Sequence, residues 1–176
     1  LPTTDIVLVG GGHAHVHVLQ AFGMRPQPGV RLTLIARELE TPYSGMLPGH
    51  VAGAYTREQI HIDLQRLCRA TGTRLIHAEA VGVDRAARRV LLRGRAPLAY
   101  DILSLDTGIT PALDSIAGAA EHALAVKPIG AFLAKFDALL ARAAQSGGPC
   151  RIVMVGGGAG GVELLLAVQA RLQALG

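Results

Sequence analysis

The most constraining feature of this sequence is a glycine-rich turn, at residues 5–17, that joins an apolar run to a helix-compatible stretch. An apolar run of this kind predicts a parallel strand buried on both faces. Gly10 permits a tight turn, and Gly12 lets a pyrophosphate approach the backbone because it has no Cβ. The following helix would direct free N–H groups and its positive dipole end at that phosphate. The segment therefore predicts the strand–turn–helix opening of a dinucleotide-binding βαβ unit.

The first turn departs from the G-x-G-x-x-G pattern, because His15 stands where a third glycine usually lets helix and strand pack closely. The pattern occurs again at residues 151–163, this time with all three glycines, Gly156, Gly158 and Gly161. Alone, the first cluster could equally be an ordinary strand-to-helix turn that binds nothing. Two clusters in one chain predict two nucleotide cofactors.

Composition restricts the alternatives. The 176 residues are enough for one ordinary domain with a sizeable core. The net charge of +4 is carried by scattered arginines, which predicts no nucleic-acid surface and a mild attraction for phosphorylated cofactors. Cys68 and Cys150 form no Cys-x-x-Cys motif, which fits a reducing, cytoplasmic compartment. No apolar run approaches the roughly 20 residues of a membrane-spanning helix.

The order of apolar patterns predicts an α/β fold. Gly and Pro are too dense at 41–50 for a regular element. Because a single strand and helix after residue 150 cannot bury both faces of that strand, we expect a fragment cut inside a second domain. The expected strands lie at 5–9, 30–35, 74–77 and 151–155, and a further, buried strand begins at about 100. Helices are expected at 13–24 and 59–71, an amphipathic stripe at 129–140 and an antiparallel meander at 78–101.

Three separated segments resemble the pyridine nucleotide-disulfide oxidoreductase superfamily: the two glycine turns, and the stretch from Tyr100 to Pro111 that contains Thr107-Gly108. Their order and spacing match along the whole chain. The sequence is most similar to the branch of type II NADH dehydrogenases and sulfide:quinone oxidoreductases. Residues 43–49 look like the FAD-dependent proteins sometimes fused to selenide, water dikinase.

The resemblance implies a three-layer, Rossmann-like FAD/NAD(P)-binding domain with a small antiparallel β-meander, truncated inside a second nucleotide-binding domain. The implied boundaries are 1–112 for the FAD-binding domain, 113–150 for a connecting helical segment, and 151–176 for the start of the NAD(P)H-binding domain.

The resemblance also implies which residues bind the cofactors. Ala36 and Arg37 stand where many dinucleotide folds have an acid, so Arg37 is expected to reach the ribose or stack on the adenine. The residues expected to contact FAD are Gly10, Gly11, Gly12, His13, Ala14, His15, Ala36, Arg37, Ser44, Ala80, Thr107 and Gly108. NAD(P)H is expected at Gly156, Gly158 and Gly161.

Two residues are candidates for catalysis. Glu163 matches a family glutamate near the flavin that often pairs with a lysine. No lysine occurs at the expected place in this sequence, and His50 is the candidate substitute. Residues 43–50 hold no Cys-x4-Cys pair, so dithiol chemistry is not expected. His13 and His17 would share a helix face, but no carboxylate or cysteine cluster lies near them, so no metal site is predicted.

The expected function of the full-length protein is hydride transfer from NAD(P)H to FAD, with electrons passed to a small-molecule acceptor such as a quinone. The alternatives are a flavoprotein that oxidises a sulfur or selenium compound, or, for this fragment, an FAD-binding module without turnover. The sequence leaves open whether the protein forms a homodimer and whether it uses NADH or NADPH. It also leaves open peripheral contact with the inner membrane through a missing C-terminus.

Overall fold

The computed structural model describes residues 3–145 and 151–174, and the chain divides into two compact units. Unit 1 comprises residues 1–41 and 62–108, and unit 2 comprises 42–61 and 109–176. The chain leaves unit 1 along β3 (Glu40–Pro42) and returns along β4 (His61–Asp63), which pair as a two-stranded sheet. The domain boundaries expected from the sequence stay a prediction.

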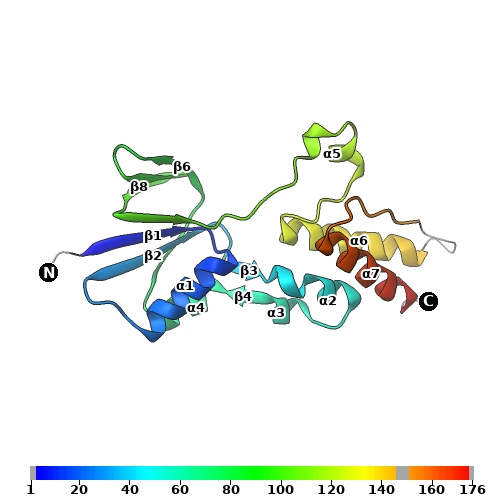
Figure 1. Cartoon of the computed structure of the whole chain (residues 1–176), viewed down its shortest axis with the longest axis horizontal. Helices are drawn as coiled ribbons and strands as arrows, with labels where there is room; N and C mark the ends of the chain where they lie inside the picture. Colours follow the sequence, from blue (N-terminus) through cyan, green and yellow to red (C-terminus); the bar gives the residue numbers. More distant parts are fainter. Residues whose placement is uncertain (1–2, 146–150, 175–176) are drawn as a thin grey trace. The chain divides into compact units, whose positions relative to one another are not determined.

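Unit 1 is built on a parallel four-stranded sheet in the order β5-β2-β1-β9. Its strands are β1 (Thr4–Val9), β2 (Val30–Ala36), β5 (Arg74–His77) and β9 (Ile102–Leu105). Helices α1 (His13–Met24) and α4 (Leu64–Ala70) cover one face (Figure 1). The antiparallel meander β6 (Ala80–Asp84), β7 (Arg89–Leu92) and β8 (Arg95–Ala99) covers the other. These layers confirm the predicted α/β fold class.

The apolar run of β1 feeds both faces of this sheet, because successive side chains of a strand point in opposite directions. Leu8 packs with Leu19 of α1 on the helical face, whereas Val7 packs with Ile35 and Val90 on the meander face. Each of these side chains is at most 1% exposed. Burial of an aliphatic side chain of this size stabilises the fold by about 1.5–3 kcal/mol.

Unit 2 is helical in the residues described. Helices α2, α6 and α7 share one core, in which Phe132 and Phe136 of α6 stack with ring centroids 5.5 Å apart. The apolar stripe expected at 129–140 is the buried face of α6, as predicted. The helices are α2 (Leu47–Ala52), α3 (Arg57–Ile60), α5 (Ala119–His122), α6 (Ile129–Gln145) and α7 (Ala159–Gln173), with 3-10 turns at Ser44–Met46 and Leu113–Ser115.

Two predictions between residues 41 and 71 were wrong. The stretch 41–50 is partly helical: Pro48 lies in the first turn of α2, where no intrahelical N–H is needed, and Leu47 and Val51 are buried one turn apart. The single helix expected at 59–71 is divided into α3 and α4 by β4. Asp63 is the N-cap of α4, and its side chain accepts a hydrogen bond from the Arg66 N–H at 2.8 Å.

Two strand predictions were also wrong. The strand expected to be buried, β9, lies at the edge of the sheet, so Ile102 and Leu105 are 52% and 61% exposed. Residues 151–155 do not form a strand, and Val153 and Val155 are exposed, because no strand in the described part of the chain pairs with them. Cys150 lies outside the described residues.

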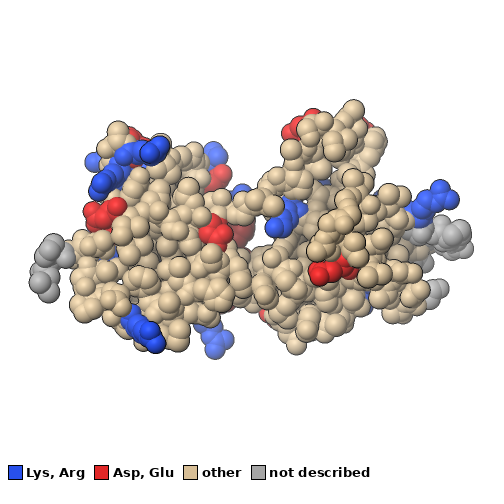
Figure 2. Space-filling view, viewed as in Figure 1, with Lys and Arg blue, Asp and Glu red and all other residues tan. Residues whose placement is uncertain are grey.

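Two surface properties bear on partners. On the face drawn in Figure 2, Lys and Arg stand in small groups separated by uncharged and acidic residues. Within residues 3–145 and 151–174, no helix combines the length and the apolar character needed to cross a membrane.

Candidate cofactor site

The first glycine turn joins β1 to α1 with a backbone that only glycine adopts easily. Gly10 has φ +96°, and a Cβ there would overlap the backbone carbonyl of Asp106. Its N–H donates to the Ile35 carbonyl at 2.8 Å, which ties the turn to β2. Gly12 is the N-cap of α1 in an extended conformation, φ −67° and ψ 173°, and brings no capping side chain.

The second glycine turn has the same backbone. Gly156 has φ +108°, and Gly158 is the N-cap of α7 with φ −72° and ψ 168°. A Cβ at Gly161 would overlap the Gly156 carbonyl oxygen, so the third glycine permits close packing of helix and turn. Both turns present a helix N-terminus behind a glycine N-cap, and this arrangement suits the diphosphate of a dinucleotide.

His15 replaces the third glycine of the first turn by making hydrogen bonds. It is 2% exposed, and its Nδ1 donates to the Gly10 carbonyl at 2.7 Å. Because a carbonyl oxygen only accepts, Nδ1 carries the proton, and Nε2 of the neutral ring accepts from the Ser104 hydroxyl at 2.9 Å. The imidazole therefore links the turn to β9.

Other residues expected to contact FAD lie near this turn, at the carboxyl ends of the strands. Ala36 ends β2, and the Arg37 carbonyl that follows accepts from Nε2 of His77 at 2.9 Å. The Arg37 guanidinium pairs with Glu38 at 3.2 Å and is mostly exposed. A Cβ added at Gly10 would lie 2.9 Å from the Cα of Thr107, so the first turn packs closely against this residue. The Ala78 N–H, two residues before Ala80, donates to the Ala36 carbonyl at 3.0 Å. This edge is where open α/β sheets bind ligands.

The remaining candidates belong to unit 2. Ser44 begins a 3-10 turn, and His50 lies in α2, where its Nδ1 donates to the Tyr55 carbonyl at 2.8 Å. That bond leaves Nε2 as the acceptor nitrogen of the neutral ring. Glu163 is exposed near the start of α7.

Sequence reasoning missed the side chains of Asp106 and Ser104. An Asp106 carboxylate oxygen accepts a hydrogen bond from the His15 N–H at 3.2 Å, and the carboxylate lies where a Cβ of Gly12 would be. The sequence places Ser104 in the last strand before Thr107-Gly108 and Asp106 directly after that strand, but their position beside the first turn depends on the pairing of β9 with β1, which the sequence does not show.

The other candidate groups have structural roles or lie elsewhere. Cys68 is buried in α4, and burial raises the pKa of its thiol to about 11. The rings of His13 and His17 meet edge to face at 5.1 Å. No group of three or more His, Cys, Asp or Glu side chains in the described ranges could hold a metal ion.

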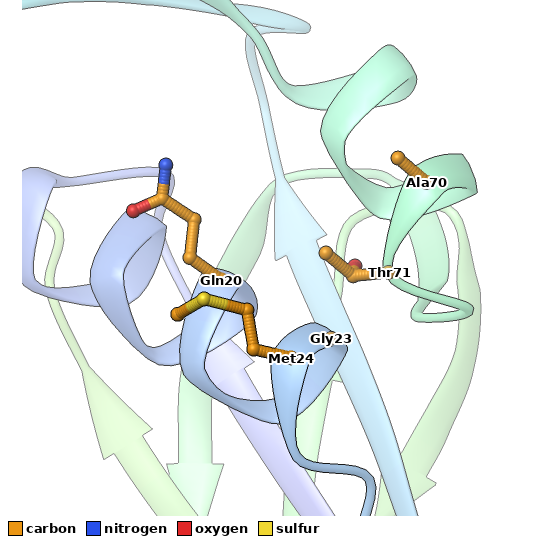
Figure 3. A pocket seen from close by; sticks show the side chains of 5 residues that line it. All are labelled: Gln20, Gly23, Met24, Ala70 and Thr71. Atoms are coloured by element: carbon orange, nitrogen blue, oxygen red, sulfur yellow. The ribbon is translucent and has the colours of Figure 1, made fainter.

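An open pocket between α1 and α4 lies away from the turn. Figure 3 shows its lining, which comes from the last turns of the two helices. With 12 residues, α1 is about 18 Å long, so this pocket is separated from the glycine turn by most of the helix. The lining residues are Gln20, Gly23, Met24, Ala70 and Thr71.

This geometry is that of a Rossmann-like nucleotide-binding fold, and the chain belongs to the pyridine nucleotide-disulphide oxidoreductase family, whose sequence pattern matches residues 4–174. The family comprises FAD-dependent oxidoreductases that use NAD(P)H. The resemblance drawn from the sequence is thereby confirmed. No curated protein matches the chain.

Solved structures of several oxidoreductases have the same fold. Sulfide:quinone oxidoreductase from Aquifex aeolicus superposes with a TM-score of 0.67 at 21% identity, over 82% of this chain and 33% of that one. NDH2 from Plasmodium falciparum in complex with NADH gives 0.76 at 19%, over 94% and 36%. The ferredoxin reductase of the CYP199A2 system from Rhodopseudomonas palustris gives 0.76 at 22%, over 96% and 41%. The chain thus spans about a third to two fifths of these proteins.

Proposed function

We propose that this chain binds FAD at the first glycine turn and NAD(P)H at the second, within a protein that passes a hydride from NAD(P)H to FAD. The observation that supports this most is the repeated backbone of the two turns, with Gly10 and Gly156 at φ +96° and +108° and a glycine N-cap two residues later. Family membership supports the same pair of cofactors. FAD supplies the two-electron chemistry when bound.

The residues of unit 1 would hold FAD from its diphosphate outward. Backbone N–H groups at the start of α1, from His13 and Ala14, would face the diphosphate beside Gly11 and Gly12. Ala36 and Arg37 would lie at the adenosine. The exposed Arg37 guanidinium would break its ion pair with Glu38 and contact the ribose or the adenine instead. The Ala80 backbone would pair with the adenine, and Thr107 and Gly108 would line the ribitol.

Residues of unit 2 would bind NAD(P)H and take part in the redox site. Gly156, Gly158 and Gly161 would seat the NAD(P)H diphosphate at α7. Glu163 and His50 would act near the flavin, and Nε2 of His50 is the nitrogen available to accept a proton or a hydrogen bond. The acceptor would be a small molecule such as a quinone, reached in the cytoplasm or at the inner-membrane surface.

The test is reduction of flavin by NAD(P)H, measured on the full-length protein. Purified protein should carry flavin absorbance, and anaerobic NADH or NADPH should bleach it. Gly10→Ala should lose the flavin because the added Cβ overlaps the Asp106 carbonyl. Gly130→Ala in α6 is the control, since no atom lies within 4 Å of the place that its Cβ would take. The proposal would be contradicted if Gly10→Ala retained its flavin. It would also be contradicted if sulfide, but not NAD(P)H, bleached the flavin of the unsubstituted protein.

A further inference from the structure

The N-terminus of α1 already has an anionic partner in this structure. Gly12 has no side chain to cap the helix, and the Asp106 carboxylate takes that role by accepting from the His15 N–H at 3.2 Å. Two backbone bonds fix Asp106 beside the turn: its N–H donates to the Val9 carbonyl at 2.8 Å, and its carbonyl accepts from the Gly12 N–H at 3.3 Å. The carboxylate therefore lies against the turn because β9 pairs with β1.

We propose that the Asp106 carboxylate competes with the FAD diphosphate for the N-terminus of α1. The inference rests on the proposed binding of FAD at the first turn. A diphosphate and a carboxylate are both anions, and both are stabilised by backbone N–H groups in the first turn of α1 and by the same positive dipole end. FAD can therefore bind only when the Asp106 side chain turns away from Gly12, and the nearby negative charge weakens binding even then.

The second turn provides an internal comparison. A Cβ at Gly158 would meet no atom within 4 Å, whereas a Cβ at Gly12 would overlap the Asp106 carboxylate. Among the described residues, the α7 N-terminus thus has no carboxylate in the equivalent place. Competition of this kind is specific to the first turn, so it would lower the affinity for FAD and leave the affinity for NAD(P)H unchanged.

The experiment is an FAD titration of the wild type and Asp106→Asn, followed by flavin fluorescence at low ionic strength. The asparagine keeps an oxygen that can accept from the His15 N–H and removes the charge. We expect FAD to bind Asp106→Asn about tenfold more tightly than wild type. The gain should shrink as salt is added, because salt screens the repulsion. NADH affinity should be equal in the two proteins.

Asp84→Asn is the matched control. Asp84 is an exposed aspartate of the meander that also accepts a backbone hydrogen bond, from the Ala87 N–H at 2.9 Å, and its substitution changes the net charge equally. FAD affinity should not change in Asp84→Asn. Circular dichroism and the Tm check folding, and Asp106→Ser repeats the test if Asp106→Asn does not fold.

The outcomes separate this inference from the proposed function. If the wild type binds FAD and Asp106→Asn binds it equally or more weakly, the inference is wrong and the proposed function stands. If only Asp106→Asn binds FAD, the inference is supported and FAD binding by the natural chain is contradicted. If neither protein binds FAD, both are overturned.

Discussion

At the scale of single residues, His15 shows how a side chain can replace the close contact that a glycine gives. In the second turn Gly161 permits helix and turn to approach, whereas in the first turn the His15 ring fills the space and bonds both neighbours. The position could be identified from the sequence as a departure from the glycine pattern. Its partner Ser104 could not, because the contact depends on the pairing of β1 with β9.

His15→Ala should destabilise unit 1 by about 1–3 kcal/mol, because the partly buried Gly10 carbonyl and Ser104 hydroxyl lose their partner. Urea unfolding followed by circular dichroism measures this loss. His17→Ala, at an exposed position of the same helix, should change stability by less than about 0.5 kcal/mol. Equal stability of the two variants would show that the His15 bonds contribute nothing.

Cys68 should react slowly with thiol reagents in the folded protein, because it is 1% exposed and burial raises its thiol pKa to about 11. The folded state holds this proton more tightly than the unfolded state, whose thiol has a pKa of 9.0. This contribution to stability is therefore present below about pH 9 and is lost as pH rises to about 11. In a Cys150→Ser variant, Cys68 is the remaining thiol, so its labelling rate at pH 8 can be compared between the native and the urea-unfolded protein. Equal rates would refute the burial of Cys68.

At the scale of elements, the parts predicted correctly are those whose pattern is local. Strands β1, β2 and β5 and helix α1 follow from apolar runs and glycine turns within one segment. The wrong strand predictions concern segments whose burial or strand structure depends on neighbouring strands. β9 is an edge strand, and residues 151–155 have no neighbouring strand in the described part of the chain. The sequence does not predict helix α2, because closely spaced proline and glycine usually interrupt a regular element, whereas Pro48 lies in the first turn of this helix, where proline is tolerated.

The start of the β1–β2 ladder should be sensitive to acid. Asp5 is directly opposite Arg31, and their side chains form a hydrogen-bonded ion pair, with Nη2 donating to Oδ2 at 2.7 Å. Hydrogen bonding to Arg31 lowers the pKa of the Asp5 carboxyl below its usual 3.8. The stability that this pair contributes is present above pH 3.8 and is lost as pH falls through the lowered pKa.

Asp5→Asn should therefore flatten the acid limb of the stability–pH profile and cause a small loss at neutral pH, since the pair is partly exposed. Chemical unfolding at a series of pH values between about 3 and 7 measures this. Arg31→Gln should give the same profile. A difference between the acid limbs of the two variants would contradict the pairing.

At the scale of the whole molecule, the chain carries two dinucleotide-type turns on two compact units. The fold class, the family and the repeated turn could be predicted from the sequence, because glycine spacing reports backbone geometry directly. The role of Asp106 could not, since it arises from a contact between segments far apart in the chain. Where Ser44, His50 and Glu163 stand relative to the flavin stays a prediction.

The central claim, that each glycine turn binds its own dinucleotide, is tested most directly by calorimetric titration of FAD and of NADH into four proteins. These are the wild type, Gly10→Ala, Gly156→Ala and the control Gly157→Ala, whose position leaves room for a Cβ. We predict that Gly10→Ala loses FAD and keeps NADH, and that Gly156→Ala loses NADH and keeps FAD. Loss of both ligands in one folded variant, or retention of both in each, would contradict the account.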